Sequence, residues 1–143
     1  MAASTRVQLL VCAALLCAGC KPTEASVKAK KTDFSMSAED LGGQCEAKKL
    51  TISTAWEGKV VEYSGRLGDV SPGTKDSPAS ALIGAPGWLL HCDLLDDQLP
   101  KAESLSKGET VKLKGTFEAC RRSQSVGGWA MDLKNCVFLD SSR

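Results

Sequence analysis

The stretch of sequence that decides the fold is TVKLKGTFE, at residues 110–118. Apolar or small residues occupy every second position, and the positions between them are polar or charged. Successive side chains of a β-strand point to opposite faces, so this alternation predicts a strand with one buried face and one face in water. The buried face is expected to carry Val111, Leu113, Gly115 and Phe117, and the other face Thr110, Lys112, Lys114, Thr116 and Glu118.

Four further segments on either side of this stretch show the same two-residue period or a short apolar run. Pro-Gly pairs at residues 72–73 and 86–87 are turn signals that separate the first three segments. In the last segment the alternation changes phase at Asn135, which predicts a β-bulge or burial on both faces. These strands are expected at residues 59–67, 79–83, 88–94 and 129–139.

Two helices are expected, one ahead of the strands and a shorter one between the third and fourth strands. Ser37 followed by Asp40 is typical of a helix start, with a hydroxyl as N-cap and an acid in the first turn. A helix over about residues 38–50 follows, although its two glycines weaken it by about 1 kcal/mol each. A shorter helix is expected within residues 96–105.

This order of elements is that of the OB-fold, a small five-stranded Greek-key barrel. The expected fold class is therefore mainly β, with an N-terminal helix and a short helix between the third and fourth strands. Gly65 and Gly115 fit such a barrel, because strongly coiled strands need positions without a side chain where the chain bends. A five-stranded open sheet with the same elements is the alternative.

The first 19 residues have the order of a bacterial signal peptide, with Arg6 ahead of an apolar run that ends in small residues. The run is shorter than the roughly 20 apolar residues that a membrane-spanning helix needs. Ala18 and Gly19 precede Cys20 as in a lipobox, so we expect cleavage before Cys20 and lipidation of its thiol. The alternative is a secreted protein cut near the same place, since Cys17 stands where a lipobox usually has leucine.

The expected domain organisation follows from the signal peptide at the N-terminus. Residues 1–19 are the signal peptide, residues 20–34 form a flexible tether rich in small and charged residues, and residues 35–143 form a single domain. Removal of the signal takes Arg6 from the 18 basic residues and leaves them equal in number to the 17 acidic ones. A neutral domain has no long-range attraction for nucleic acid, so no nucleic acid is expected as a partner.

The cysteines indicate an oxidising compartment. Of the seven in the chain, two leave with the signal and Cys20 is committed to lipid. An even set of four remains, which favours two disulfides over metal binding or catalysis. Three pairings are open from sequence alone, and free buried thiols are the alternative. The set consists of Cys45, Cys92, Cys120 and Cys136.

Four stretches together resemble a known group, the small bacterial OB-fold domains described as tRNA-anticodon-binding-like, which are common in exported proteins and lipoproteins. They are GKVVEYSGRL at residues 58–67, HCDL at 91–94, LSKGETVKLKG at 105–115 and MDLKNC at 131–136. The resemblance implies a fold and carries no catalytic residues, and it demonstrates no binding of tRNA. Because the third and fifth strands of an OB barrel are neighbours, the resemblance also implies a Cys92–Cys136 disulfide and, together with it, a Cys45–Cys120 disulfide.

No motif of a known enzyme class occurs in the chain. His91 adjoins Cys92, but neighbours on a strand point to opposite faces, so the imidazole is not expected to activate the thiol. Asp93, Asp96 and Asp97 lack the loop of a calcium site. We therefore expect no enzyme activity, no metal and no cofactor. The alternative is an enzyme subunit whose site would show as a deep pocket near His91 or Arg121.

A binding surface is the remaining candidate. OB-folds bind ligands across their second and third strands and between the loops that join strands 1 to 2 and strands 4 to 5. A polar loop is expected over residues 121–128, where Arg121 and Arg122, with Trp129 at the far end, could clamp an anionic or sugar ligand. The alternative is a solvated hairpin whose tryptophan packs over the end of the barrel.

Together these features predict a non-catalytic lipoprotein of the bacterial cell envelope, facing the periplasm or the exterior. Its lipid anchor would hold it to a membrane, and its barrel would bind an envelope protein or a glycan. An enzyme subunit and a purely structural envelope domain are the alternatives.

Overall fold

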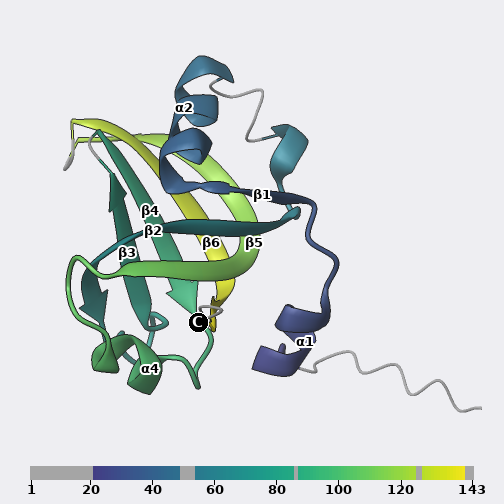
Figure 1. Ribbon diagram of the computed structural model, residues 1–143, viewed down its shortest axis with the longest axis vertical. Helices are drawn as coiled ribbons and strands as arrows, with labels where there is room; N and C mark the ends of the chain where they lie inside the picture. Colours follow the sequence, from purple (N-terminus) through teal and green to yellow (C-terminus); the bar gives the residue numbers. More distant parts are fainter. Residues whose placement is uncertain (1–20, 49–53, 86, 125–126, 141–143) are drawn as a thin grey trace, which may run out of the picture.

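Five strands close into a barrel in the computed structural model, which describes residues 21–48, 54–85, 87–124 and 127–140 (Figure 1). Antiparallel pairs join β2 to β3, β3 to β4 and β5 to β6, while β4 and β6 run parallel. An antiparallel pairing of β2 with β5 closes the sheet. This confirms the OB-fold barrel and excludes the open sheet. The strands are β2 Val60–Ser71, β3 Ser80–Ala85, β4 Trp88–Leu94, β5 Thr110–Ser123 and β6 Gly128–Leu139.

The barrel closes tightly where its glycines lie. A Cβ atom on Gly115 would stand 2.7 Å from Sγ of Cys136, and one on Gly65 would stand 2.6 Å from Cγ2 of Ile83. Both distances are far shorter than a van der Waals contact. The two glycines thus let a neighbouring side chain approach the backbone of β2 and β5, as expected for coiled barrel strands.

One helix lies across each end of the barrel (Figure 1). At one end α2, Ala38–Lys48, begins as expected, because the Ser37 hydroxyl accepts a 3.0 Å hydrogen bond from the amide of Asp40. Its fully buried Leu41 packs into the core. At the other end α4, Leu99–Ser104, is shorter than the segment expected to be helical.

The predicted change of phase in β6 is a β-bulge at Asn135, whose φ is 52°. Cys92 of β4 pairs with Leu133, but Leu94 pairs with Cys136, so β6 contains one extra residue over this interval. The bulge allows both Leu133 and Cys136 to be fully buried.

The segment ahead of the barrel is not a flexible tether, which corrects that expectation. Residues Phe34–Ser37 form β1, which pairs in parallel with β2 along Val61 to Ser64. Upstream, α1 spans Glu24–Ala29 and buries its one large apolar residue, Val27, against Leu95 and Val137. Within the described ranges, no helix is long and apolar enough to cross a membrane.

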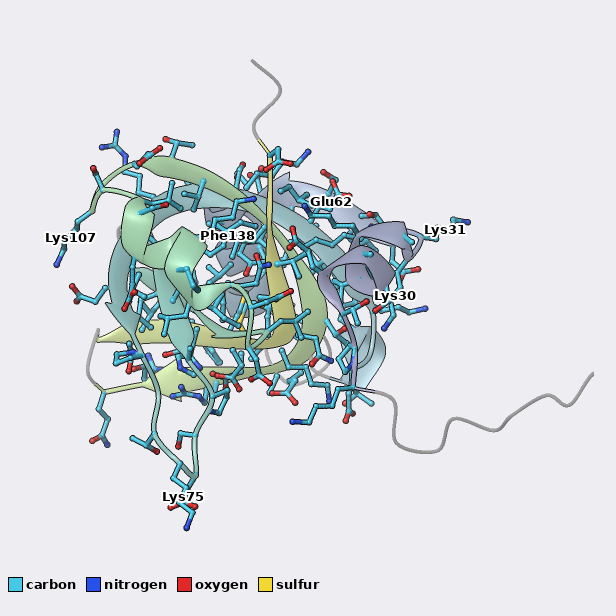
Figure 2. The ribbon with its side chains drawn as sticks, turned by 90° about the horizontal axis from the view of Figure 1, so that it is seen from below. Lys30, Lys31, Glu62, Lys75, Lys107 and Phe138 are labelled. Atoms are coloured by element: carbon cyan, nitrogen blue, oxygen red, sulfur yellow. A yellow bond between two sulfur atoms is a disulfide. The ribbon has the colours of Figure 1, made fainter. Side chains whose placement is uncertain are left out.

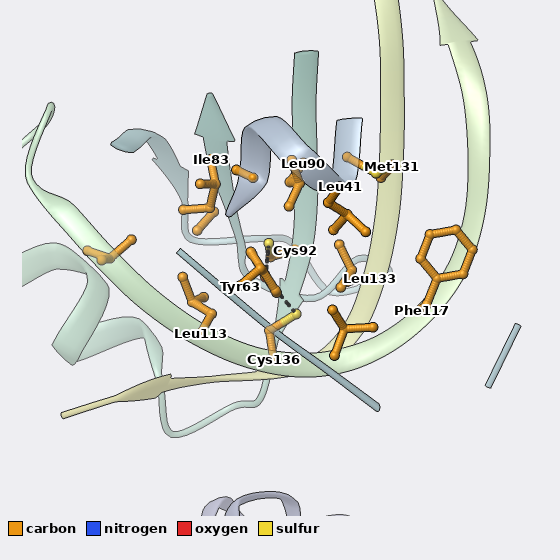
Figure 3. Packing of buried hydrophobic residues seen from close by; sticks show 14 of the residues in the cluster. Leu41, Tyr63, Ile83, Leu90, Cys92, Leu113, Phe117, Met131, Leu133 and Cys136 are labelled. Atoms are coloured by element: carbon orange, nitrogen blue, oxygen red, sulfur yellow. Dashed lines mark hydrogen bonds between the residues drawn. The ribbon is translucent and has the colours of Figure 1, made fainter. Parts of the chain in front are cut away.

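The core contains two kinds of cysteine. Cys45 of α2 and Cys120 of β5 form a disulfide with a Cα–Cα distance of 6.1 Å, the second pair that the resemblance implies. Cys92 and Cys136 are free thiols, which corrects the expectation of a Cys92–Cys136 disulfide. The hydroxyl of Tyr63 lies 2.5 Å from Sγ of Cys92 and donates to Sγ of Cys136 at 3.6 Å (Figure 3). The phenol thus contacts both buried thiols.

The predicted signal peptide, residues 1–19, and the predicted lipidation site, Cys20, lie outside the described residues.

Candidate functional site

A row of charged side chains crosses the outer face of β4, β6 and β5. His91 of β4 and Asp132 of β6 are paired across the parallel strands. Their neighbours Cys92 and Leu133 are fully buried, so His91 and Asp132 point outward. Arg121 of β5 joins them from the other side of β6. We call Asp93, His91, Asp132 and Arg121 the outer charged row.

Asp132 is the centre of this row. Its carboxylate accepts two hydrogen bonds from Arg121, 2.7 Å from Nε to Oδ2 and 3.2 Å from Nη2 to Oδ1. This bidentate arrangement holds both groups in one geometry. Nδ1 of His91 lies 3.6 Å from Oδ1 of Asp132 and 3.8 Å from Oδ1 of Asp93. The imidazole is therefore placed between two carboxylates.

These contacts shift the titration of the row. The neighbouring His91, followed by Arg121, lowers the pKa of Asp132 to about 2, while partial burial opposes the shift. Asp132 in turn raises the pKa of His91, again against burial. Asp93 differs, because burial is the main cause that raises its pKa. Asp132 is thus a fixed anion, and His91 is the member of the row that titrates nearest neutral pH.

Apolar groups border the row on β3 and β4. Leu82 is paired with His91 across these strands, and Leu89 lies two residues before His91 on the same face. Both are only partly buried. Gly84 of β3 is paired with Leu89 and leaves open space where a Cβ would lie. The face therefore combines charged hydrogen-bonding groups with accessible apolar surface. Its leucines, with His91 and Asp93, lie on the second and third barrel strands, with which OB-folds bind ligands, whereas Asp132 and Arg121 lie on the fifth and fourth strands.

The structure separates the residues predicted as a clamp. The expected loop over residues 121–128 is wrong in its bounds, because β5 continues to Ser123 and β6 starts at Gly128. Arg121 and Arg122 are therefore strand residues on opposite faces. Arg121 belongs to the outer charged row, whereas the guanidinium of Arg122 lies 5.9 Å from the centre of the Trp129 ring.

Trp129 packs against the hydrophobic core at the end of the barrel, as the alternative reading of this hairpin expects. Beside it, a cleft of about 410 Å³ is lined by Arg122, Ser123, Gln124, Gly127 and Gly128. The residues predicted to form one clamp thus lie at two separate sites: Arg121 on the outer face, and Arg122 with Trp129 at the hairpin.

A larger cleft, about 480 Å³, opens beyond Asp93 at the end of β4. Of the outer charged row, only Asp93 lines it. Asp96 and Asp97 also line it, and no group of three or more metal-ligating side chains is found among the described residues.

Asp132 is the residue that reading the sequence missed. It stands in the MDLKNC stretch, but its place beside His91 depends on the parallel register of β4 and β6. Lys114 is predicted to face water, but this prediction is wrong. The residue points out of the barrel and is only 4% exposed, because the N-terminal segment covers it.

Comparison with known protein families finds no match, and no curated protein matches. Among solved structures, one from Klebsiella pneumoniae, provisionally named a nucleic acid-binding lipoprotein, superposes with a TM-score of 0.60 at 14% identity, over 84% of this chain and 100% of that one. A Leishmania major protein provisionally named an aspartyl-tRNA synthetase gives 0.49 at 9% identity, over 85% of this chain but only 23% of that one. At such identities the likeness shows the OB-fold and no more.

Proposed function

We propose that this chain is a non-catalytic lipoprotein of the bacterial cell envelope whose barrel binds an envelope protein or glycan through the outer charged row and the leucines beside it. The observation that carries the proposal is the ordered ion-pair row centred on Asp132 of the fifth barrel strand, which His91 and Asp93 extend onto the third strand of the OB barrel. OB-folds bind their ligands on that strand and its neighbour.

The row suits recognition better than catalysis. A carboxyl whose pKa is about 2 is ionised at neutral pH and cannot act as a general acid there. Cys92, the nearest nucleophile in sequence, lies on the opposite face of β4 and is fully buried. The fixed carboxylate and guanidinium do offer acceptors and donors to polypeptide amides or sugar hydroxyls.

The name of the Klebsiella pneumoniae structure does not fit our expectation that nucleic acid is no partner. The chemistry of this chain favours that expectation. Arg121 is paired with Asp132, and Asp93 adds a second carboxylate to the same row. A nucleic acid would bring its phosphates toward these carboxylates, whereas single-strand binding needs a basic groove with stacking aromatics.

An envelope location is supported by two observations. The Cys45–Cys120 disulfide is of a kind that persists in oxidising compartments, and the Klebsiella pneumoniae neighbour is named a lipoprotein. Intact-mass analysis of the protein extracted from membranes tests the anchor. We expect a chain that starts at Cys20 and carries a diacylglyceryl group. A chain that retains residues 1–19, or an unmodified Cys20, would remove the anchor from the proposal.

Site-specific photo-crosslinking in cells tests the binding face. A photoreactive amino acid at Leu82 or Leu89 should capture the same discrete species, while one at Ser35, exposed on β1, should not. In parallel, purified protein should not bind a single-stranded oligonucleotide. Equal capture at all three positions would contradict the proposed face. Oligonucleotide binding that is lost in Arg121→Ala would show a nucleic-acid partner instead.

A further inference from the structure

The N-terminal segment is fastened to the barrel at several successive points, although its composition is typical of a linker. Besides β1, the hydroxyl of Thr32 donates a 2.7 Å hydrogen bond to Glu62, and Asp33 exchanges backbone and side-chain hydrogen bonds with Val60. Further upstream, Val27 of α1 is 2% exposed and packs on the barrel's small second apolar cluster. We call residues 21–37 the strap.

A buried lysine of the barrel holds the strap in place. Nζ of Lys114 donates to the carbonyl oxygens of Lys28, at 2.9 Å, and of Lys30, and lies 3.8 Å from Glu62. In Figure 2, Glu62 and Lys30 lie on the side of the barrel that α1 covers. If α1 left, apolar surface around Val27 would be exposed and the ammonium would lose two acceptors. Apolar burial of Val27 and the hydrogen bonds of Lys114 therefore both favour the docking of α1 on the barrel.

The attachment continues to the first described residue. Thr23 and Ser26 form a capping box that starts α1, with hydrogen bonds of 3.2 and 2.9 Å. Ahead of it, Lys21 and Pro22 line the 480 Å³ cleft together with residues 93–97. Nζ of Lys21 lies 3.9 Å from Oδ2 of Asp96. Within the described part of the chain, the strap therefore lies beside the barrel from Lys21 onward.

From this we infer that the strap holds one end of the barrel, the end formed by Pro78 and Leu94–Asp97, directly against lipid headgroups. The inference rests on the proposed lipid anchor at Cys20. One trans peptide separates Cys20 from Lys21, so their Cα atoms are about 3.8 Å apart. A thiol carrying membrane-embedded acyl chains must therefore bring the cleft to the membrane surface. The opposite end, with α2 and the β5–β6 hairpin, points away.

The charges at this end suit a zwitterionic headgroup. Asp96 and Asp97 can accept hydrogen bonds from the ammonium of phosphoethanolamine, and Lys21 can pair with its phosphate. The cluster is too acidic to be drawn to an anionic surface by itself. The anchor supplies the affinity, and the strap supplies the orientation.

Lipidated full-length protein in vesicles tests the inference. The vesicles would contain a phosphatidylethanolamine with a photoactivatable headgroup, and labelled peptides would be mapped by mass spectrometry. We expect several-fold more label in peptides covering residues 21–31 and 94–105 than in peptides covering the hairpin at residues 120–130. Equal labelling of both ends on lipidated protein would overturn the inference while leaving the anchor intact. Absence of lipid on Cys20 would overturn the anchor and the inference together.

Variants of the strap make the test specific. Val27→Asp and Lys114→Met should each release α1 and spread the label to the hairpin end. Lys112→Met is the matched control, because Lys112 also lies on β5 and pairs with Glu62 but touches no carbonyl of the strap in the described contacts. Far-UV circular dichroism would establish that each variant is folded. A label pattern that both strap variants leave unchanged would contradict the role of the strap.

Discussion

His91 and Cys92 are neighbours in β4, and the two faces of the barrel give them opposite surroundings. Cys92 points inward to Tyr63 and Cys136, in a cluster with no formal charge. His91 points outward into a row of two carboxylates and a guanidinium. One strand thus contributes a polar group to each side, and burial decides what each group can do.

The pKa values show the difference. Burial raises the pKa of Tyr63 and of Cys136, so both of these groups favour their neutral forms. On the outer face, ionic neighbours lower the pKa of Asp132 and raise that of His91, so both favour their charged forms. The inner cluster should therefore govern stability. The outer row, whose ion pairs reach solvent, should add little stability and remain free to bind.

Gly115→Val is expected to have the largest effect, because it adds atoms on the inner face where a Cβ alone would lie 2.7 Å from the Cys136 sulfur. Overpacking of this kind costs about 3 kcal/mol or more where the backbone must move. Urea denaturation should show a free energy of unfolding lowered by that amount, or no folded protein. Gly43→Ala in α2 is the control, since nothing lies within 4 Å of the new Cβ and helix propensity should improve. Wild-type stability in Gly115→Val would contradict the close approach.

Tyr63→Phe should weaken the inner cluster without changing its shape. The ring stays, but Cys92 and Cys136 lose the hydroxyl that contacts both sulfurs. Loss of such buried contacts should lower the free energy of unfolding by about 1 kcal/mol. Thermal or urea denaturation would measure it. An unchanged or raised stability would mean that the phenol contributes nothing to the cluster.

Asp132→Asn should alter the outer face while costing less than about 1 kcal/mol of stability. The pKa of His91 should fall toward its ordinary value of 6.5, because Asp132 is the main cause of its rise. His91 is the chain's one histidine, so its imidazole signal can be followed by NMR without assignment. Asp93→Asn is the matched comparison and should lower the pKa of His91 by less. The reverse order would place the centre of the row at Asp93.

The smallest expected effect is in the pH dependence of stability. The folded pKa of Asp132, about 2, lies below its ordinary 3.8, so its contribution is present above that ordinary value and lost as pH falls toward 2. The pKa of His91 is raised, so its contribution is present below 6.5 and lost as pH rises through the folded value. Urea denaturation of wild type and Asp132→Asn between pH 2 and 8 should differ by under about 1 kcal/mol and converge at the acid end. If the stability difference between wild type and Asp132→Asn grew as the pH fell, it would contradict a lowered pKa of Asp132 in the folded protein.

The barrel could be predicted from sequence because its longest strands alternate over most of their length, most strictly at residues 110–118, and because the helix-and-strand order is that of one fold. The strap could not be predicted from sequence, because α1 has six residues and only Val27 marks its buried face. The outer charged row requires the register of β4 against β6, in which a bulge at Asn135 intervenes. The expected Cys92–Cys136 disulfide gave way to thiols that contact Tyr63, a residue from a distant strand whose approach no local pattern signals.

The separation of the two faces is tested most directly by photo-crosslinking from Leu89 in cells that carry either Asp132→Asn or Tyr63→Phe, with yields normalised to folded protein. We predict that the captured species is lost in Asp132→Asn, although that variant unfolds close to the wild-type temperature. In Tyr63→Phe it should be retained, although that variant unfolds at a lower temperature. Capture that survives Asp132→Asn and disappears in Tyr63→Phe would contradict the assignment of binding to the outer face.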